Sequence, residues 1–411
     1  MILENDKILT AKVVDRAVTD DNLNGSEKPF PAAPRFLSVD FYRGVVVAFM
    51  ILVNTPGTLH YVYPPLAHAR WIGCTLADLV FPCFLFLTGV SMQLSFAKFK
   101  AAWSVEFGKK VLRRTVLIFL IGFLLNKFPV YWEHLDHWRV MGVLQRIALS
   151  FGIASLLVLT LRTRALIAVS VGILLLYWGV LLFFATPGGD PYGIDTNAAF
   201  NLDRWLYGVE VDAAMHLDHW LFGDDYFWHG NGFHFDPEGL LGVIPSVVTV
   251  ILGWLSATLM ARRSRQKTLL LRDLLAIGTA CCLAGLAWGV FFPISKKLWT
   301  SSFVLYAGGF SVILLAACIW LIDIYGWRRG TGFFLVFGAN PLFAFILSEG
   351  LEQIAFNIPC GEGDAYEWAY ARFFQPLDGG ELGSFLFAVS YMLLCWLICR
   401  WLYVRRIFVK I

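Results

Sequence analysis

The sequence predicts an all-α protein, a polytopic bundle of membrane helices. The chain has 411 residues, of which 58% are hydrophobic and only 15% are charged. Its mean hydropathy is +0.65, a balance typical of a polytopic membrane protein and not of a soluble one. Sixteen tryptophans and fourteen tyrosines suit the aromatic belts at the two faces of a bilayer. The net charge of +3 indicates no nucleic-acid partner, so the lipid bilayer is the expected surrounding.

About ten stretches are apolar enough to cross a bilayer, which takes ~20 predominantly apolar residues. They lie near 38–54, 75–97, 110–126, 141–160, 165–185, 240–261, 270–292, 302–323, 332–350 and 383–403. The first is the shortest and most polar, because it contains Asp40 and Arg43. Residues 1–34 are polar and carry mixed charges. We therefore expect a flexible cytoplasmic tail over 1–34 and a transmembrane domain over 35–411.

The placement of lysine and arginine predicts the orientation, because cationic loops stay on the cytoplasmic side. With the tail inside, the inner loops and the C-terminal end hold 19 Lys and Arg residues, and the outer loops hold seven. Both termini are therefore expected in the cytoplasm. On this topology all eight histidines lie on the outer side or at its membrane boundary. The outer loop 186–239 is unusually long, and a connection of that length usually serves a site.

The stretch HARWIGCTLAD, 68–78, places titratable groups beside an apolar run. His68 follows Asn54 by fourteen residues, and Asp78 lies ten residues further on, near the start of the second span. A histidine titrates near neutral pH and can act as a general base, and a neighbouring carboxylate can set its tautomer. The alternative is an interfacial histidine that is bonded to the backbone. The polar neighbours favour a site.

The first span carries charges of its own. Asp40 and Arg43 are three residues apart, close enough to pair on one helix face. An ionisable residue inside a span marks a functional site by default, although a buried pair that only fixes the helix explains these two equally well. Asn54 precedes the helix-breaking Thr-Pro-Gly. It either caps the helix or orients a carbonyl or amine in a site.

The stretch RVMGVLQRIALS, 139–150, places polar side chains on a span of aliphatic residues. Arg139 and Arg146 are seven residues apart and share a helix face, with Gln145 beside them. A buried guanidinium needs an anion or a carbonyl as partner. The sequence leaves open whether that partner is a carboxylate such as Asp78 or Glu238, or a substrate.

Three later motifs also place polar groups at span ends or inside a span. Asp236 and Glu238 open a span, where the helix dipole explains one carboxylate, and two suit a cationic amine or sugar hydroxyls. PISKKLWTSS, 293–302, has paired lysines at an outer helix start. GANPLF, 338–343, predicts a break inside a span near a cavity.

Several chemistries find little support. HLDHW occurs at 134–138 and 216–220 and places histidines at i and i+3, a spacing that suits a metal ion. No HExxH accompanies it and the tryptophans favour an interfacial belt, so we predict no metal site. A GxSxG nucleophile elbow and a Walker-type phosphate loop are absent from the sequence. A serine hydrolase of that type and an ATP-driven pump are therefore unsupported.

Six separated motifs together resemble a known family. They are RFLSVDFYRG, MILVN, HARWIGCTLADLVFPCFLF, RVMGVLQRIAL, FDPEGLL and KKLWTSSFVLY. In this order they resemble heparan-α-glucosaminide N-acetyltransferase and its bacterial NagX-like relatives, which are transmembrane acyltransferases. The resemblance runs from about Arg35 to the C-terminus.

The resemblance implies acetyl transfer across a membrane, from acetyl-CoA on the cytoplasmic side to the amine of a glucosamine on the far side. The family's essential histidine stands in a His-Ala-x-Trp context, which corresponds to His68. Its asparagine in a Val-Asn pair corresponds to Asn54, and its aspartate to Asp78. His68 would accept the amine proton or carry the acetyl group, so direct and ping-pong transfer both stay open. Asn54 would hold or polarise the thioester carbonyl, and Asp78 would orient His68.

The remaining polar residues are assigned to substrate binding. The residues expected to line the outer acceptor pocket are Arg139, Gln145, Arg146, Asp236 and Glu238. Asp40 and Arg43 are further candidates for substrate binding. The cytoplasmic cations that could attract the CoA phosphates are Lys109, Lys110, Arg113 and Arg114, although the positive-inside rule alone explains them.

The expected function is therefore that of an inner (plasma) membrane acetyltransferase, with acetyl-CoA as donor and an amino sugar or glycan that faces the periplasm as acceptor. The alternative is a transporter of N-acetylglucosamine or related sugars, in which His68 and the carboxylates bind sugar or couple protons. The lack of evident inverted repeats counts against it. A structural or partner-binding role leaves the polar spans unexplained. A homo-oligomer is compatible with the sequence.

Overall fold

The computed structural model describes residues 36–96, 104–129, 138–183, 213–223, 236–361 and 363–409. Phe36–Ile411 forms one compact unit. Its regular secondary structure in the described part is helical, apart from a small hairpin of β1 (Pro359–Cys360) and β2 (Gly363–Asp364). The predicted all-α fold is confirmed. The predicted tail 1–34 lies outside the described residues, as does most of the predicted outer loop 186–239.

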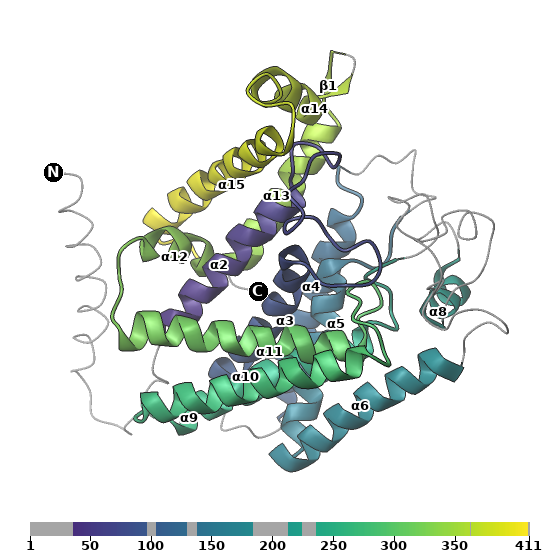
Figure 1. Ribbon diagram of the computed structural model, residues 1–411, viewed down its shortest axis with the longest axis vertical. Helices are drawn as coiled ribbons and strands as arrows, with labels where there is room; N and C mark the ends of the chain where they lie inside the picture. Colours follow the sequence, from purple (N-terminus) through teal and green to yellow (C-terminus); the bar gives the residue numbers. More distant parts are fainter. Residues whose placement is uncertain are drawn as a thin grey trace. The chain divides into compact units, whose positions relative to one another are not determined.

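Thirteen α-helices make up the described part of the chain (Figure 1). They are α2 (Leu37–Asn54), α3 (Leu76–Phe96), α4 (Val105–Leu125), α5 (Val143–Thr160), α6 (Thr163–Phe183), α8 (Ala213–Phe222), α9 (Val243–Arg262), α10 (Lys267–Gly289), α11 (Ser301–Cys318), α12 (Thr331–Ala339), α13 (Pro341–Phe356), α14 (Ala365–Ala369) and α15 (Glu381–Val404). Two π-helical turns, η4 (Ile319–Ile324) and η5 (Tyr370–Phe374), continue α11 and α14. Helix α8 lies within the predicted outer loop.

Eight described helices are long and apolar enough to cross a membrane, and nine spans result if the bent pair α12 and α13 counts as one. The predicted span 110–126 corresponds to α4, which is not among them because five of its first ten residues are charged. Its second half, from Thr115 to Leu125, carries no charge. The predicted multi-pass helical membrane protein is thus confirmed, with α4 as the most polar of its long helices.

The predicted break at 338–343 is present. Helices α12 and α13 meet at an angle of 83°, with Asn340 at the corner and Pro341 as the first residue of α13, a position that suits proline. The Asn340 side chain donates to Ile407 O and accepts from Val409 N, both at 2.9 Å. The polar side chain at this break therefore holds the C-terminal segment in place.

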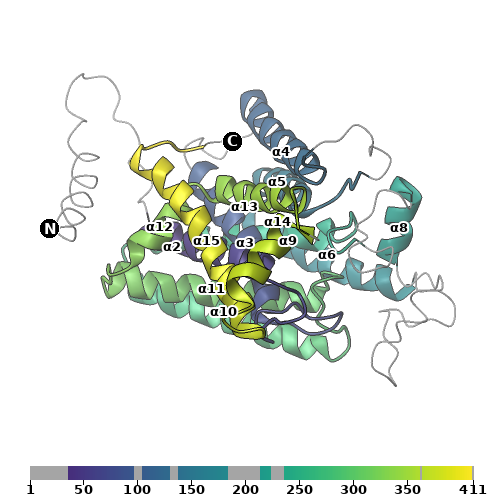
Figure 2. The ribbon, with the colours of Figure 1, turned by 90° about the horizontal axis from the view of Figure 1, so that it is seen from above.

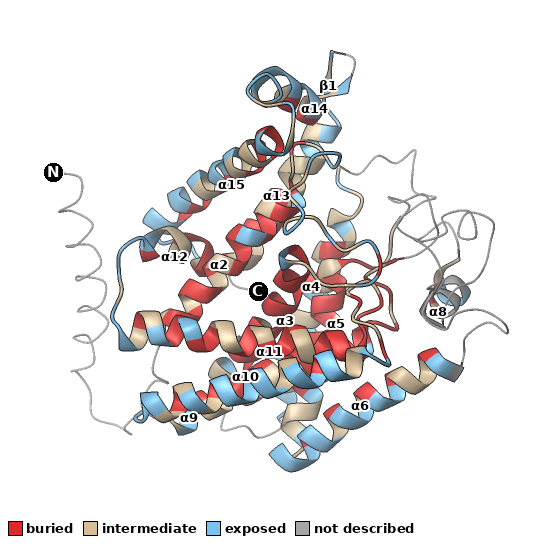
Figure 3. Cartoon of the chain, viewed as in Figure 1, coloured by how far each residue is buried: buried red, intermediate tan, exposed pale blue. Residues whose placement is uncertain are grey.

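Helix α3 lies at the centre of the described bundle, and it packs along α9 (Figures 1 and 2). The two helices cross at Gly89 and Gly253. A Cβ atom at Gly89 would lie 1.9 Å from Val250 O, and one at Gly253 would lie 1.9 Å from Phe86 O. Small residues permit this close approach. Figure 3 shows α3 largely buried, whereas α6 and α10 expose one long face each, as expected of helices that meet lipid.

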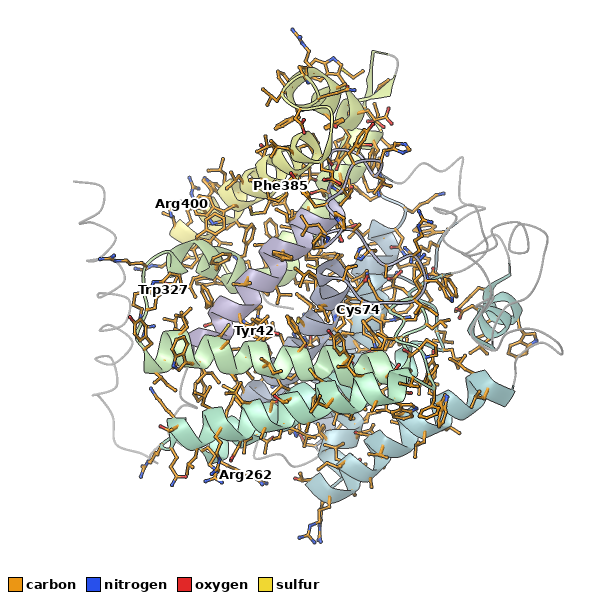
Figure 4. All side chains as sticks on the ribbon, in the orientation of Figure 1. Tyr42, Cys74, Arg262, Trp327, Phe385 and Arg400 are labelled. Atoms are coloured by element: carbon orange, nitrogen blue, oxygen red, sulfur yellow. The ribbon has the colours of Figure 1, made fainter. Side chains whose placement is uncertain are left out.

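The loop 55–75, between α2 and α3, positions the candidate site; Cys74 in Figure 4 marks its end. A backbone hydrogen bond from Gly73 N to Ile294 O, at 2.8 Å, joins this loop to the segment that leads into α11. The C-terminal end of α2 and the N-terminal ends of α3, α5, α9 and α11 are brought together around these loops by the contacts described next.

Candidate active site

The central contact on the loop between α2 and α3 joins His68 to Asp78. His68 Nδ1 lies 2.8 Å from Asp78 Oδ1. The other carboxylate oxygen accepts hydrogen bonds from the backbone nitrogens of Ala69 and Thr75, each at 3.0 Å, and from Thr75 Oγ1 at 3.1 Å. These bonds fold the loop over the first turn of α3 and leave the Asp78 side chain 1% exposed. The carboxylate is therefore held firmly against the imidazole.

This contact assigns the proton on the imidazole ring. An ionised carboxylate only accepts hydrogen bonds. Nδ1 of His68 therefore carries the ring proton and donates a hydrogen bond to Asp78. The other ring nitrogen, Nε2, then keeps a lone pair. The His68 side chain retains 40% of its exposure, so the ring is accessible from the outside of the fold. Such a nitrogen can take a proton or form a covalent bond with an acyl group.

Lys296 is the third charged group at this position. Its Nζ lies 3.3 Å from His68 Nδ1 and 3.8 Å from Asp78 Oδ1. Because Nδ1 already donates to the carboxylate, it has no lone pair to offer the ammonium group. Lys296 is therefore an ionic partner of Asp78 that stands beside the imidazole. We call His68, Asp78 and Lys296 the base cluster.

The loop 290–300, which carries Lys296, is held in one conformation. Ser295 Oγ donates to Trp71 O at 2.6 Å and so ties it to the neighbouring loop. Trp299 has a φ of 52°, in the left-handed region that bulky residues rarely adopt, at a cost of roughly 1–3 kcal/mol. Its ring is fully buried, 5.1 Å from the ring of Phe81. Tertiary packing therefore fixes the backbone beside Lys296.

The environment of His68 keeps its imidazole neutral at neutral pH. Burial lowers the pKa of His68 below its ordinary value of 6.5, and the charge of Lys296 lowers it further. The carboxylates of Asp78 and Glu238 oppose this shift without reversing it. Burial also lowers the pKa of Lys296, and the same two carboxylates counter that fall. The neutral ring is the form that accepts a proton.

A second polar group, called the clamp below, consists of Arg139, Asp236 and Glu238. Arg139 Nε and Nη2 donate to the two carboxylate oxygens of Asp236 at 2.7 and 2.6 Å. Arg139 Nη2 also donates to Glu238 Oε2 at 2.6 Å. The clamp ties the segment before α5 to the turn before α9. The sequence left Asp78 and Glu238 open as partners of Arg139. Arg139 pairs with Glu238 and not with Asp78, and it also pairs with Asp236.

Electrostatics link the clamp to the base cluster. Burial alone would lower the pKa of Arg139, but its two carboxylates outweigh burial and raise it. The pKa of Glu238 is shifted as well. Burial would raise it, but the charges of Arg139, Arg146 and Lys296 lower it below 4.5. Glu238 is thus the carboxylate that both groups share.

Arg146 and Gln145 lie buried beside the clamp. Arg146 Nη2 donates to Gly239 O at 3.1 Å, and its guanidinium carbon lies 5.0 Å from the centre of the Trp299 ring. A Cβ atom at Gly242 would lie 2.4 Å from Arg146 Nη2, so a side chain there would displace the guanidinium. Within the described residues, Arg146 Nε and Nη1 and Gln145 Oε1 have no hydrogen-bond partner. These atoms retain the capacity to bind a ligand group or water.

Asn54 stands at the C-terminal end of α2 and its side chain is exposed. Its Nδ2 lies 3.5 Å from Glu349 Oε1, at the long limit of a hydrogen bond. No hydrogen bond joins Asn54 to His68 or Asp78 among the described residues. Glu349, on α13, lies within electrostatic reach of Arg139. Asn54 is therefore linked to the clamp through Glu349.

Asp40 and Arg43 lie at the other end of α2. The two side chains pair at 3.0 Å, and Arg43 Nη2 donates to Ser91 Oγ at 2.8 Å. Asn54 follows Arg43 by eleven residues, about 16 Å along the helix axis. The structure therefore does not bring this pair to the base cluster. It forms a separate polar group at the opposite end of the bundle.

The sequence is similar to that of known N-acetyltransferases. A sequence profile described as "Heparan-alpha-glucosaminide N-acetyltransferase, catalytic" matches residues 35–202. The human protein named heparan-alpha-glucosaminide N-acetyltransferase is 28% identical over 403 residues, which cover 85% of this chain and 58% of the human protein. The mouse protein of that name is 27% identical over 367 residues, covering 78% of this chain and 54% of its own.

Over residues 35–202 this chain is similar to the catalytic region of heparan-alpha-glucosaminide N-acetyltransferases. The resemblance predicted from the motifs is thus confirmed. The chain spans less than two thirds of the length of these curated relatives. The profile match contains Asn54, His68, Asp78 and Arg139. The carboxylates of the clamp lie beyond residue 202.

Two residues of this candidate site have no role assigned from the sequence. Lys296 belongs to a marked lysine pair, but the sequence does not tell which lysine faces the histidine. Glu349 has a weaker signal, as a glutamate inside an apolar helix. Within the described residues no group of three or more His, Cys, Asp or Glu side chains could hold a metal ion. The HLDHW histidine side chains lie outside those residues.

Proposed function

We propose that this chain is a membrane acetyltransferase that transfers an acetyl group from acetyl-CoA to the amine of an amino sugar or glycan on the outer side. The observation that carries the proposal is the pairing of His68 with Asp78 at 2.8 Å, which leaves Nε2 as a base. The similarity to N-acetyltransferases supports the reaction class. The positive-inside charge pattern supports an inner-membrane location with the site facing outward.

The chemistry follows from the base cluster. His68 Nε2 takes a proton from the acceptor ammonium, and the freed amine attacks the thioester carbonyl carbon. A C–N bond forms, and negative charge develops on the carbonyl oxygen, which the Asn54 amide would stabilise as donor. The C–S bond then breaks, the imidazolium gives its proton to the departing CoA thiolate, and the second proton of the attacking nitrogen passes to water, which leaves a neutral amide. Asp78 holds the ring in the correct tautomer throughout.

The acceptor pocket would lie between the base cluster and the clamp. The residues proposed to line it are Arg139, Gln145, Arg146, Asp236 and Glu238. Arg139 remains 21% exposed, and buried Arg146 and Gln145 have unused polar atoms. Glu349, beside Asn54, adds a carboxylate that would attract an ammonium group before it is deprotonated.

The donor would approach from the opposite end of α2. Arg43 and Arg114 lie within electrostatic reach of each other there, and the exposed first half of α4 carries Lys109, Lys110 and Arg113. These five cations would suit the phosphate groups of CoA. The pantetheine arm is a long flexible chain, suited to reach along α2 toward Asn54.

Release of free thiol from acetyl-CoA tests this function. Purified protein in nanodiscs is given acetyl-CoA with and without glucosamine, and the wild type is compared with His68→Ala. We expect release that depends on the amine and is lost in the variant. No release across a panel of amino sugars, together with sugar uptake into proteoliposomes, would overturn the enzyme and favour the transporter.

Direct transfer and a carried acetyl group are separated in the same preparation. The protein is incubated with acetyl-CoA alone, and its peptides are examined by mass spectrometry. An acetylated His68 peptide that loses its acetyl group on addition of glucosamine indicates the ping-pong route. An unmodified peptide, with thiol release only when the amine is present, indicates direct transfer.

A further inference from the structure

Lys296 stands where its charge acts on both partners of the base. Its Nζ lies 3.3 Å from His68 Nδ1 and 3.8 Å from Asp78 Oδ1, on a side chain that is only 18% exposed. Nδ1 cannot accept from the ammonium while it donates to Asp78. The ion-pair partner of the ammonium is therefore the carboxylate oxygen that already holds the imidazole.

The fold directs the two neighbouring lysines differently. Lys297 Nζ lies 5.7 Å from the centre of the Trp71 ring, whereas Lys296 faces the histidine. Between them and α11 stands Trp299 with its left-handed backbone and fully buried ring. Strain of this kind persists only where the surroundings impose one conformation. The orientation of Lys296 is therefore set by the loop as a whole.

We propose that Lys296 is the positioning residue of the base: its ammonium group holds the Asp78 carboxylate and keeps the His68 imidazole neutral until a substrate amine delivers a proton. Once the ring is an imidazolium, the adjacent ammonium repels it and drives the proton on to the leaving thiolate. No other reactant is needed for this step. The role of the residue in catalysis rests on the proposed function, but its effect on His68 does not.

The charges that face His68 come from three segments. They are Asp78 on α3, Glu238 in the turn before α9, and Lys296 in the loop before α11. Asp78 cannot take over as the base, because its oxygens already accept from Ala69, Thr75 and the imidazole. Lys296 is thus the one positive charge among these three.

The test measures the protonation of His68 without any acetyl transfer. Diethyl pyrocarbonate reacts with neutral imidazole, so the rate at which the His68 peptide is modified, followed by mass spectrometry across pH, gives its titration midpoint. Lys296→Met removes the charge at similar length. We expect its midpoint about one pH unit above that of the wild type, the shift typical for losing a like charge at this distance.

Three variants complete the comparison. Lys296→Arg keeps the charge and should restore the wild-type midpoint. Lys297→Met removes the neighbouring charge and should leave the midpoint almost unchanged. Lys296→Gln keeps a polar side chain without the charge, and it replaces Lys296→Met as the test if that variant does not give a monodisperse protein.

An unchanged midpoint in the uncharged Lys296 variants, or an equal rise in Lys297→Met, overturns the proposal. The pH profile of kcat/KM gives the second readout, since its acid limb should move upward by the same amount. If the modification midpoint moves but no variant or wild type releases thiol, the acetyltransferase function fails and the assignment of Lys296 to His68 stands.

Discussion

The clamp and the base cluster use the same kinds of side chain and differ in how completely their charges are satisfied. In the clamp, Arg139 donates to both carboxylates at 2.6–2.7 Å. In the base cluster, one carboxylate oxygen of Asp78 serves both an imidazole at 2.8 Å and an ammonium at 3.8 Å. The clamp leaves both of its carboxylates ion-paired, whereas the base cluster leaves Nε2 of His68 with a lone pair.

The difference indicates that the clamp has a structural role and that the base cluster has a chemical one. A buried bidentate ion pair fixes two segments and has little reason to exchange protons, because its charges hold one another. A neutral ring at 40% exposure, held by a carboxylate at 1% exposure, is firmly oriented and still accessible. Glu238 stands in the clamp and also acts on His68, so the two groups are neighbours with separate tasks.

The largest expected effect is the loss of the base. His68→Ala should lower kcat/KM for amine acetylation roughly 10³–10⁴-fold, because a general base contributes up to that factor. The unfolding temperature should hardly change, since the ring is exposed and its described side-chain partners are two residues of the base cluster. His60→Ala is the matched control, an exposed histidine on the same loop. Equal losses in both variants would contradict the assignment.

Breaking the clamp should act on stability instead. Arg139→Met leaves Asp236 and Glu238 buried without their cation, which should cost about 3 kcal/mol, roughly 150-fold in the folding equilibrium. The measurement is the apparent unfolding temperature in detergent, followed by kcat of the folded fraction. We expect a fall of several degrees with kcat within a few-fold of the wild type. A large rise in KM for the amine at unchanged stability would contradict the structural role of the clamp and leave Arg139 with its proposed place in the acceptor pocket alone.

The base cluster and the clamp should also lose their effects at different pH values. Activity should fall about tenfold per pH unit once the pH drops below the pKa of His68, which lies under 6.5. The pKa of Glu238 is depressed, so its stabilising contribution is present above pH 4.5 and is lost only below that. Between the pKa of His68 and that of Glu238 the protein should lose activity reversibly and stay folded. Unfolding temperatures that fall in step with activity would contradict this.

The smallest expected effect concerns Glu349, which contacts Asn54 only at the long limit of a hydrogen bond. Glu349→Gln should raise KM for the amine about three- to tenfold and leave KM for acetyl-CoA unchanged, as expected for one weak charge contact. Steady-state kinetics with each substrate varied in turn provide the measurement. Glu352→Gln, one turn further along α13, is the control. A change confined to acetyl-CoA would place Glu349 with the donor.

Much of the fold could be predicted because hydropathy is a local property. The first span was expected at 38–54 and runs over Leu37–Asn54, and the break inside 338–343 is where Asn340 and Pro341 require it. The apolar run at 110–126 missed the start of α4. That helix begins at Val105, after an N-cap at Ser104. Its first turns are charged, so a search for apolar residues does not include them.

In the candidate site too, contacts between residues close in sequence could be predicted and those between distant residues could not. Ten residues separate His68 from Asp78, so their pairing within one loop could be expected from the sequence and the family motif. The partner of Arg139 stayed open between Asp78 and Glu238, because Glu238 lies 99 residues away. Lys296 meets His68 across 228 residues. No local pattern distinguishes it from Lys297.

The sequence by itself determined the helical membrane class, nearly every span and the histidine–aspartate pair. These depend on the cost of placing polar groups in lipid and on short loops, both of which act locally. Only the tertiary structure decided which charges meet. It pairs Arg139 with Asp236 and Glu238 and places Lys296 beside His68. Such contacts depend on the packing of helix ends that lie far apart in the chain.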